Sequence, residues 1–290
     1  MIHSFRLTLL PALAALVLSG AGAYAQNGDK LTAAGLKAAA KNVVAQEQNA
    51  TGSGKKPSCS APKDVARLDR PLARTARLIA AGLPVKIVAL GSSSTAGAGA
   101  SASYASYPSQ LEMALGKRFP DNGITVINRG VNGEEAPDML ARLETQVLSE
   151  KPDLVIWQVG TNAVLRDNPI APSSSQIDQG IERIKAAGAD VILIDPQFAP
   201  KVLGKSTLSR MLDLLAVKAK QYNVNLFQRF AVMRDWRERQ GLPFETFVSP
   251  DQLHMNDWSY ACVAKVLSGA IAEAATRPTA SAAAAAHTAR

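Results

Sequence analysis

The sequence predicts an α/β protein in which helices cover both faces of a central, mainly parallel five-stranded sheet. Five short apolar runs rich in β-branched residues recur along the chain, and segments of helical periodicity separate them. Runs that are apolar throughout, rather than alternating, are typical of parallel strands buried on both faces. Together these observations indicate a three-layer α/β/α sandwich of flavodoxin-like form.

The predicted elements alternate in a regular order. The strands are expected at 85–90, 124–128, 153–159, 190–195 and 224–227. The helices between them are expected near 107–117, 137–149, 174–187 and 206–221. Sheets of this kind place their ligand sites in the crevice beyond the carboxyl ends of the strands, so functional residues are expected directly after the strands.

The first 25 residues resemble a bacterial secretory signal peptide. The basic start MIHSFR precedes the apolar run LTLLPALAALVLSGAGA, and AYA before Gln26 has the small-x-small form of a signal-peptidase site. No later segment approaches the ~18 continuous apolar residues of a membrane span. We therefore expect a signal peptide over 1–25 and a periplasmic or secreted mature chain without a transmembrane span.

Residues 26–84 are expected to form a basic, partly helical extension. Helical patterns cover 31–48 and 64–82, and Pro71 interrupts the second. The extension holds ten Lys and Arg against four Asp and Glu, whereas residues 85–276 hold nineteen against twenty. Because the main domain is nearly neutral, a nucleic-acid surface is not expected. The extension could contact an anionic envelope polymer, or its charges could simply form a solvated face.

Residues 85–276 are expected to form the main domain. Its last helix is predicted over 256–275, with Asn256 and Asp257 as good capping residues. The low-complexity residues 277–290 are expected to be a disordered tail.

The chain has two cysteines, Cys59 in the extension and Cys262 in the last predicted helix. They lack the spacing of metal ligands, so no metal site is predicted from them. Two such thiols often pair in an oxidising compartment. The sequence leaves a disulfide and two free thiols as equal alternatives, since it does not reveal the distance between the two Cα atoms.

Histidine is scarce, and His254 is the one histidine of the main domain, because His3 lies in the signal peptide and His287 in the tail. His254 follows Asp251 by three residues in SPDQLHMND. A turn at this spacing would let Asp251 accept a hydrogen bond from one imidazole nitrogen while the other faces a substrate. A general base near neutral pH needs this arrangement. The alternative is a capping aspartate beside a surface histidine.

The stretch VALGSSSTAG, residues 88–97, ends the first predicted strand with three serines between glycines. Gly91 permits a sharp turn, and the N–H groups of a following helix could support a negative charge. The residues alone leave three alternatives: a polar loop, a phosphate-binding loop and a strand end that presents a nucleophile. They do not distinguish among Ser92, Ser93 and Ser94.

Two further strand ends carry polar turns. Gly133, in INRGVNGEE after the second strand, could let its backbone N–H approach a ligand. Asn162, in VGTNA after the third strand, could direct its amide group into the same crevice. Either residue could equally belong to an ordinary turn.

In their order and spacing, GSSST, VNGEE, GTNA and DQLH resemble the four sequence blocks of the SGNH hydrolases, also called the GDSL esterase family. The resemblance aligns Gly91-Ser92-Ser93 on the family's Gly-Asp-Ser and implies that Ser93 is the nucleophile of a triad. Asp251 and His254 would complete that triad. The backbone N–H groups of Ser93 and Gly133 and the Asn162 amide would form the oxyanion hole. No metal or organic cofactor is implied.

Two positions depart from the family pattern. Ser92 stands where the first block has its aspartate, and Ala163 stands where an aspartate usually follows Gly-x-Asn. Asp167 and Glu134 are nearby carboxylates that could replace the missing acids.

The resemblance, which covers residues 85–275, implies a serine esterase that works through an acyl-enzyme. Export and the lack of a long lipid-binding insertion favour short-chain, O-acetyl type esters of small molecules or carbohydrates as substrates. Lysophospholipase, thioesterase and acyltransferase activities remain alternatives, because a fold does not fix a substrate. A non-catalytic envelope-binding domain and a flavodoxin-like FMN protein are the alternatives from other classes.

Overall fold

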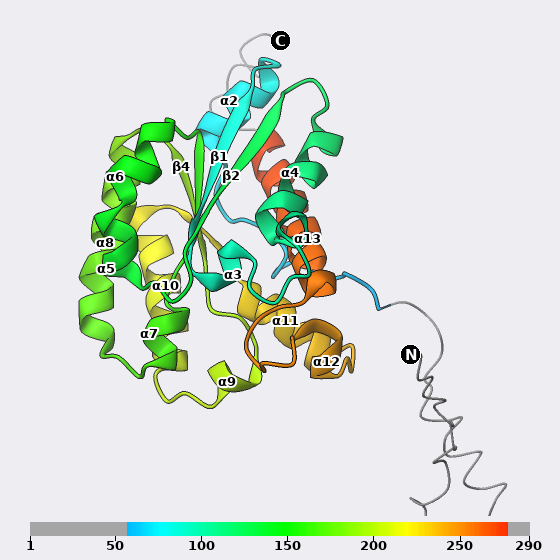
Figure 1. Cartoon of the computed structure of the whole chain (residues 1–290). Helices are drawn as coiled ribbons and strands as arrows, with labels where there is room; N and C mark the ends of the chain where they lie inside the picture. Colours follow the sequence, from blue (N-terminus) through cyan, green and yellow to red (C-terminus); the bar gives the residue numbers. More distant parts are fainter. Residues whose placement is uncertain (1–56, 278–290) are drawn as a thin grey trace, which may run out of the picture. The chain divides into compact units, whose positions relative to one another are not determined.

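The computed structural model describes residues 57–277 (Figure 1). The predicted signal peptide, the helix predicted over 31–48 and residues 278–290 of the predicted tail lie outside the described residues. One five-stranded sheet has the order β2-β1-β3-β4-β5, and every neighbouring pair is parallel. Its strands are β1 (Val85–Gly91), β2 (Ile124–Gly130), β3 (Leu154–Gln158), β4 (Asp190–Ile194) and β5 (Asn225–Phe227).

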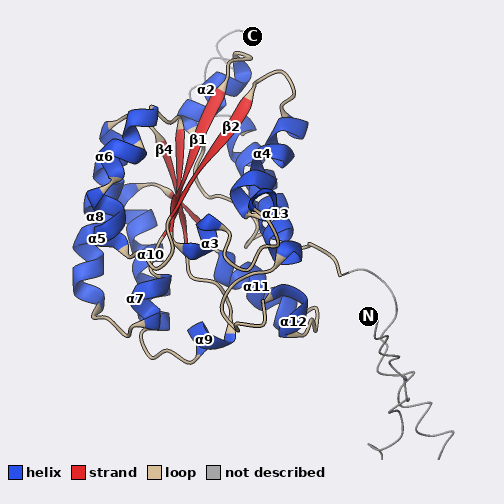
Figure 2. Ribbon diagram, viewed as in Figure 1, coloured by secondary structure: helices blue, strands red, loops and turns tan. Residues whose placement is uncertain are grey.

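Helices cover both faces of this sheet, as Figure 2 shows. The longer ones are α2 (Ala73–Ala80), α4 (Tyr107–Arg118), α8 (Ile170–Ala186), α10 (Leu208–Tyr222), α11 (Arg229–Glu238) and α13 (Asp257–Thr276). Helix α13 packs against α4 and α2, whereas α8 packs against α10 and the short helix α5 (Ala136–Ala141). The predicted three-layer α/β fold is therefore confirmed, and its sheet is parallel throughout.

Short helices line the loops that connect these elements. They are α3 (Ser93–Ala96), α6 (Leu143–Gln146), α7 (Thr161–Leu165), α9 (Pro200–Leu203) and α12 (Phe244–Phe247), with 3-10 turns at Ser103–Ala105 and Leu148–Glu150. The helix predicted over 137–149 is thus broken into α5, α6 and a 3-10 turn. The break falls at Arg142, whose side chain turns inward to bind Glu134 and the carbonyl of Arg129.

Helix α11 was not predicted, and its buried face explains why. Two of the buried positions on this face are charged, Arg229 and Asp235, among Val232, Met233 and Trp236. The apolar stripe that indicates an amphipathic helix is therefore interrupted by charged residues.

The folded unit begins at Pro57, so the predicted domain boundary at residue 85 is too late. Leu68 and Leu72 are fully buried in the same core as the sheet. Of the helix predicted over 64–82, only α2 forms, and Pro71 lies just before its start. The segment could not be assigned from its sequence because polar contacts with distant strands hold it in place.

The C-terminal boundary differs slightly as well. Arg277, the first residue of the predicted tail, donates hydrogen bonds to the carbonyl oxygens of Leu68 (2.8 Å) and Asp69 (3.1 Å). The last described residue is thus attached to the start of the folded unit.

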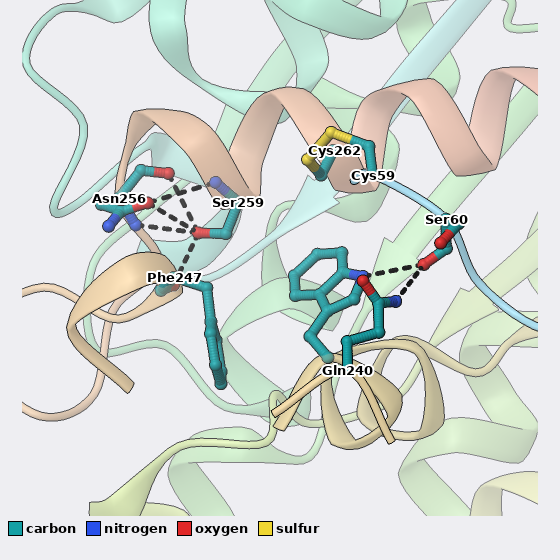
Figure 3. The surroundings of a disulfide bond; sticks show 8 residues. Cys59, Ser60, Gln240, Phe247, Asn256, Ser259 and Cys262 are labelled. Carbon is teal, nitrogen blue, oxygen red and sulfur yellow. Dashed lines mark hydrogen bonds between the residues drawn. A yellow bond between two sulfur atoms is a disulfide. The ribbon is translucent and has the colours of Figure 1, made fainter. Parts of the chain in front are cut away.

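A disulfide joins Cys59 to Cys262 on α13, with 4.9 Å between the Cα atoms. Beside it, the carbonyl oxygen of Ser60 accepts hydrogen bonds from the Gln240 amide (2.9 Å) and the Trp236 indole (3.1 Å) (Figure 3). These contacts fix the first described residues against α13 and the end of α11. Within residues 57–277, no helix has both the length and the apolar character needed to cross a membrane.

Candidate active site

The strand order brings three of the predicted site residues to one edge of the sheet. Ser93 is the first residue of α3, directly after β1. Gly133 follows β2, Asn162 lies in the first turn of α7 after β3, and β1 is the strand between β2 and β3. Parallel strands end at the same edge, so the glycine and asparagine loops lie on either side of Ser93.

Two glycines allow α3 to lie against the ends of these strands. A Cβ atom on Gly130 would overlap the backbone of Ala96, and one on Gly91 would overlap the side chain of Thr95. Since no other residue fits such close approaches, the glycines determine how near the serine comes to the sheet.

The predicted triad residues lie within hydrogen-bond distance of one another. His254 Nε2 is 2.8 Å from Ser93 Oγ, and His254 Nδ1 is 2.5 Å from Asp251 Oδ2. The backbone N–H groups of Leu253 and His254 donate to Asp251 Oδ1 at 2.9 Å. The Asp251 carboxyl therefore binds its own loop and the imidazole together.

A backbone bridge and a left-handed residue shape the loop that carries Asp251 and His254. An antiparallel bridge joins Val248 to Met255 and closes the loop at its base. Gln252 adopts a left-handed backbone conformation (φ 61°), which turns the chain between Asp251 and His254. Immediately after the loop, Asn256 caps α13 and forms a capping box with Ser259 (Figure 3). The histidine thus stands just before the N-terminus of the longest helix described.

The Asp251 carboxyl is held in its charged form. Partial burial alone would raise its pKa, but hydrogen bonds from the His254 ring and from the backbone N–H groups of His254 and Leu253 lower it overall. A carboxylate accepts from a protonated Nδ1, and this tautomer leaves Nε2 as the acceptor for the Ser93 hydroxyl. The polarity of the contacts suits proton transfer from serine to histidine.

Ser93 differs from the serines on either side of it. Ser92 and Ser94 are each 1% exposed, whereas Ser93 is partly open to solvent. The Ser92 hydroxyl donates to Gln158 Oε1 (3.0 Å), and the Ser94 hydroxyl donates to Gln197 Oε1 (3.4 Å). Of the three hydroxyls, only that of Ser93 lies against His254.

The environment of Ser92 explains why a serine can stand at this position. Gln158 Oε1 accepts from the Ser92 backbone N–H (2.9 Å), from the Ser92 hydroxyl (3.0 Å) and from the Thr95 hydroxyl (3.3 Å). An aspartate in place of Ser92 would direct a carboxylate at this amide oxygen, and two acceptors repel each other. Ala163 is 5% exposed, so it too occupies a buried position.

The two carboxylates considered as replacements for the missing acids bind cations instead. Glu134 forms an ion pair with Arg142 (2.6 Å), and Asp167 forms one with Lys205 (2.7 Å). Glu134 thereby links the loop after β2 to the end of α5, and Asp167 links the end of α7 to the segment that follows α9.

The predicted oxyanion-hole residues are also oriented by their neighbours. The Asn162 amide donates one hydrogen to the Glu134 carbonyl (2.8 Å), which leaves its second hydrogen available. Gly133 has a φ of 79°, and its carbonyl accepts from Arg166 (2.9 Å). No hydrogen bond within the described chain uses the backbone N–H of Gly133 or of Ser93.

A buried arginine contacts the loop after β4, and no motif in the sequence indicated its role. Arg229 is 1% exposed and donates from Nε to the Asp195 carbonyl (3.0 Å). Burial lowers the pKa of Arg229, although Asp195, Tyr260 and Tyr107 oppose the shift. Burial also raises the pKa of Asp195 to about 7, against the effect of the Phe230 N–H and of Arg229. Asp195 and the glutamines at 158 and 197 all end or follow strands, a signal that could have identified them.

The loop that carries the histidine also lines a cavity of about 380 Å³. Its walls combine apolar and polar residues: Pro200, Phe244, Val248 and Pro250, with Glu245, Ser249, Gln252 and Asn256. Among residues 57–277, no three His, Cys, Asp or Glu side chains are grouped so that they could hold a metal ion.

Several known proteins are similar to this chain. It is 32% identical to an arylesterase of Vibrio mimicus over 125 residues, which cover 43% of this chain and 61% of the arylesterase. It is 42% identical to an acetylxylan esterase of Geobacillus stearothermophilus over 48 residues, which cover 17% and 22% of the two chains. The chain therefore matches less than two thirds of either relative.

The fold also has a solved counterpart. A two-domain esterase active on acetylated mannans, crystallised with mannopentaose, superposes with a TM-score of 0.63 at 22% identity, covering 76% of this chain and 59% of that one. At this identity the likeness concerns the fold.

A family model shows where the chain belongs. The model of the non-GDSL lipase-like family matches residues 58–277, which is nearly the whole of the described structure. The match includes the segment before residue 85, in agreement with the early start of the folded unit. The family name also suits a first block that lacks the GDSL aspartate. The resemblance to SGNH hydrolases is thus confirmed, and the chain belongs to the non-GDSL lipase-like family.

Proposed function

We propose that this protein is a carboxylic ester hydrolase in which Ser93 is the nucleophile, His254 the general base and Asp251 the residue that orients the base. The single observation that carries the proposal is the continuous series of contacts from the Asp251 carboxylate through both imidazole nitrogens to Ser93 Oγ. A serine hydroxyl is a weak nucleophile near neutral pH and needs such a base.

In the proposed reaction, Ser93 Oγ attacks the ester carbonyl carbon and His254 Nε2 takes the hydroxyl proton. When the tetrahedral intermediate collapses, the bond to the leaving alcohol breaks and His254 returns the proton to that alcohol. Water then attacks the acyl-serine with the same base, which releases the acid and restores Ser93. Asp251 remains ionised throughout and stabilises the imidazolium.

The negative charge of the tetrahedral intermediate would be held by three donors. We assign these to the backbone N–H groups of Ser93 and Gly133 and to the free amide hydrogen of Asn162. Two contacts support the assignment: the Glu134 carbonyl binds one Asn162 amide hydrogen, and Arg166 binds the Gly133 carbonyl, so both residues are held in place. Donors fixed before the reaction stabilise developing charge without reorganisation.

The substrates we propose are short-chain, O-acetyl type esters of carbohydrates or small molecules. The cavity beside the histidine loop supports this proposal, because it combines the ring of Phe244 with polar groups such as Glu245 and Gln252. A sugar ring has an apolar face and a polar edge, so it can contact walls of both kinds. The acetylxylan esterase and the mannan esterase similar to this chain, by their names, act on acetylated carbohydrates.

We also propose that the mature protein acts outside the bacterial cytoplasm. The signal-peptide pattern over residues 1–25 supports export. The disulfide between Cys59 and Cys262 is of the kind that persists in oxidising compartments. Fractionation of cells expressing the full chain, with N-terminal sequencing of the product, tests this; an uncleaved cytoplasmic protein would contradict it.

The test of the catalytic proposal compares the three neighbouring serines. We expect Ser93→Ala to lower kcat for p-nitrophenyl acetate by roughly 10⁴-fold or more, because the nucleophile is lost. Ser92→Ala and Ser94→Ala are controls that keep this hydroxyl and should retain measurable turnover. A fluorophosphonate probe should label the wild type and both controls but not Ser93→Ala. Wild-type turnover by Ser93→Ala would overturn the assignment.

The substrate is tested by the release of acetate. Acetylated xylan and mannan oligosaccharides are compared with a lysophospholipid and an acyl thioester, with Ser93→Ala as the blank. We expect the acetylated oligosaccharides to give the highest kcat/KM. A preference for the lysophospholipid or the thioester would replace the proposed substrate class without affecting the nucleophile.

A further inference from the structure

Gln197, in the loop after β4, is 1% exposed and connects four separate segments. Its Nε2 donates to the carbonyl oxygen of Leu253 (3.3 Å) in the histidine loop. Its Oε1 accepts from the hydroxyl groups of Thr161 (3.1 Å) and Ser94 (3.4 Å). Arg229 Nη2 donates to the same oxygen (3.0 Å). A single amide thus contacts α3, α7, α11 and the loop before α13.

Three of these partners share one property: each is the immediate neighbour of a residue in the proposed mechanism. The pairs are Ser94 with Ser93, Thr161 with Asn162, and Leu253 with His254. The nucleophile, the oxyanion donor and the base come from sequence positions far apart, so their relative placement depends on contacts between loops. Gln197 contacts the residue next to each of the three.

Arg229 determines the orientation of the Gln197 amide. A guanidinium has donors only, so the Gln197 oxygen must face it and the NH₂ group must face Leu253. The reversed amide would place NH₂ against the guanidinium and oxygen against a carbonyl. Arg229 is itself held by its Nε bond to the Asp195 carbonyl, and a bond from a charged donor is stronger than a neutral one. The amide is therefore locked in one orientation.

We propose that Gln197 is a positioning residue of the esterase site. Its hydrogen bonds hold the segments that carry the nucleophile, the oxyanion donor and the histidine in fixed positions relative to one another. The inference rests on the proposed function, because it assigns consequences for Ser93, Asn162 and His254. Gln197 does not touch the reacting atoms. Its effect comes from geometry, since small displacements of catalytic groups lower rates strongly.

The test replaces Gln197 by Met, which keeps the length of the side chain and removes every hydrogen bond. Asn225→Leu is the matched control: Asn225 is a buried amide at the start of β5, where it accepts from the Arg70 N–H (2.8 Å) and donates to the Arg70 carbonyl (3.1 Å). Both changes remove a satisfied buried amide, but only one lies at the carboxyl ends of the strands.

We expect Gln197→Met to lower kcat for p-nitrophenyl acetate roughly 10–100-fold. KM should stay within about twofold, because a small ester makes few contacts to lose. Hydrogen–deuterium exchange should rise over residues 249–256 in this variant. Asn225→Leu should lower stability, leave kcat unchanged and raise exchange near residues 70–75 instead. Thr161→Val, which removes one of the contacts, should give an intermediate kcat and serves if Gln197→Met does not fold.

The outcomes separate this inference from the proposed function. Unchanged kcat and unchanged exchange over 249–256 in Gln197→Met, or in Thr161→Val if it replaces that variant, would overturn the positioning role. An equal loss of kcat in Asn225→Leu would also overturn it, because the effect would then follow stability alone. A wild type without Ser93-dependent hydrolysis would instead refute the proposed function, and the exchange measurement would still decide whether Gln197 orders the histidine loop.

Discussion

The two ends of the same sheet use buried polar groups for different purposes. At the amino ends of β3, β4 and β5, the polar side chains bind the segment that precedes β1. At the carboxyl ends of β1, β3 and β4, the polar side chains bind one another and surround residues with unused hydrogen-bonding capacity. In the sequence, the polar residues at the two ends of the strands look alike, because at both ends they lie beside apolar runs. The two groups differ in the residues to which they form hydrogen bonds.

At the amino end, the polar groups bind the chain before β1 and, at one position, β1 itself. Asp190 accepts from the Thr75 backbone N–H and hydroxyl, both at 2.8 Å. Asp153, just before β3, accepts from Arg74 Nε (2.7 Å) and from the Lys86 backbone N–H (2.8 Å). The bonds from Arg74 and Thr75 attach residues 57–84 to the sheet, so we expect their loss to lower stability and leave catalysis intact.

At the carboxyl end, the buried glutamines form hydrogen bonds that hold the loops, whereas Ser93 is partly open to solvent. Gln158 fixes Ser92, Gln197 fixes three loops, and Ser93 remains partly open to solvent. Here we expect the opposite result, in which activity falls much more than stability.

Among the variants that compare the two ends, the largest effect is expected at Asn162, at the carboxyl end. Asn162→Ala should lower kcat by about 10²–10³-fold, because one of three oxyanion donors is lost. Asn168→Ala is the matched control, since Asn168 donates to Glu135 in the neighbouring loop (2.8 Å) but takes no part in the proposed hole. For both variants, kcat is measured by steady-state kinetics and stability by thermal unfolding. Similar kinetic losses in the two would show that loop attachment, rather than oxyanion binding, is what matters.

The next effect concerns the covalent attachment of the first described residues. The disulfide closes a loop with a sequence separation of 203 residues. Replacing both Cys59 and Cys262 by Ala should lower the free energy of unfolding by about 2–4 kcal/mol, since the unfolded chain gains freedom. kcat should not change under conditions where the variant is folded. Urea unfolding with and without reductant checks this: reductant should destabilise the wild type but not the double variant.

A smaller loss is expected at the amino end. Asp190→Ala leaves the buried N–H and hydroxyl of Thr75 without their acceptor, so the free energy of unfolding should fall by about 1–3 kcal/mol with kcat unchanged. Asp213→Ala, at an exposed position of α10, should change stability by less than about 0.5 kcal/mol. A kcat loss in Asp190→Ala comparable to that of Asn162→Ala would end the distinction between the two ends.

The contrast between the two ends also explains what could be predicted from the sequence. The strands were predictable because their burial on both faces makes them continuously apolar, as in β3 and β4. The segment before β1 was assigned to the wrong side of a domain boundary, because its attachment depends on Asp190 and Asp153, 79 or more residues away from their partners in it. No local pattern records such a contact.

The candidate site shows the same division. Ser93, Asn162 and His254 lie in short motifs whose order and spacing resemble the SGNH blocks, and this resemblance made them predictable from the sequence. Gln158, Gln197 and Arg229 have no such motif. Gln158 and Gln197 end or follow strands, which could have indicated that they lie near the site, but the loops that they join depend on the strand order.

The smallest expected effect is a pH dependence of stability at Asp251. Its pKa is lowered in the folded chain, so its stabilising contribution is present above the pKa of the unfolded carboxyl, ~3.9, and is lost as pH falls through the folded value. Asp251→Asn keeps an acceptor for His254 but has no charge to lose. Between pH 5 and 3, the melting temperature of the wild type should therefore fall slightly more than that of Asp251→Asn. The difference should be small because the Asp251 side chain is 43% exposed and its interactions are screened by water. A difference as large as the fall in melting temperature caused by Asp190→Ala would mean that the residues at the carboxyl end contribute to stability as well as to catalysis.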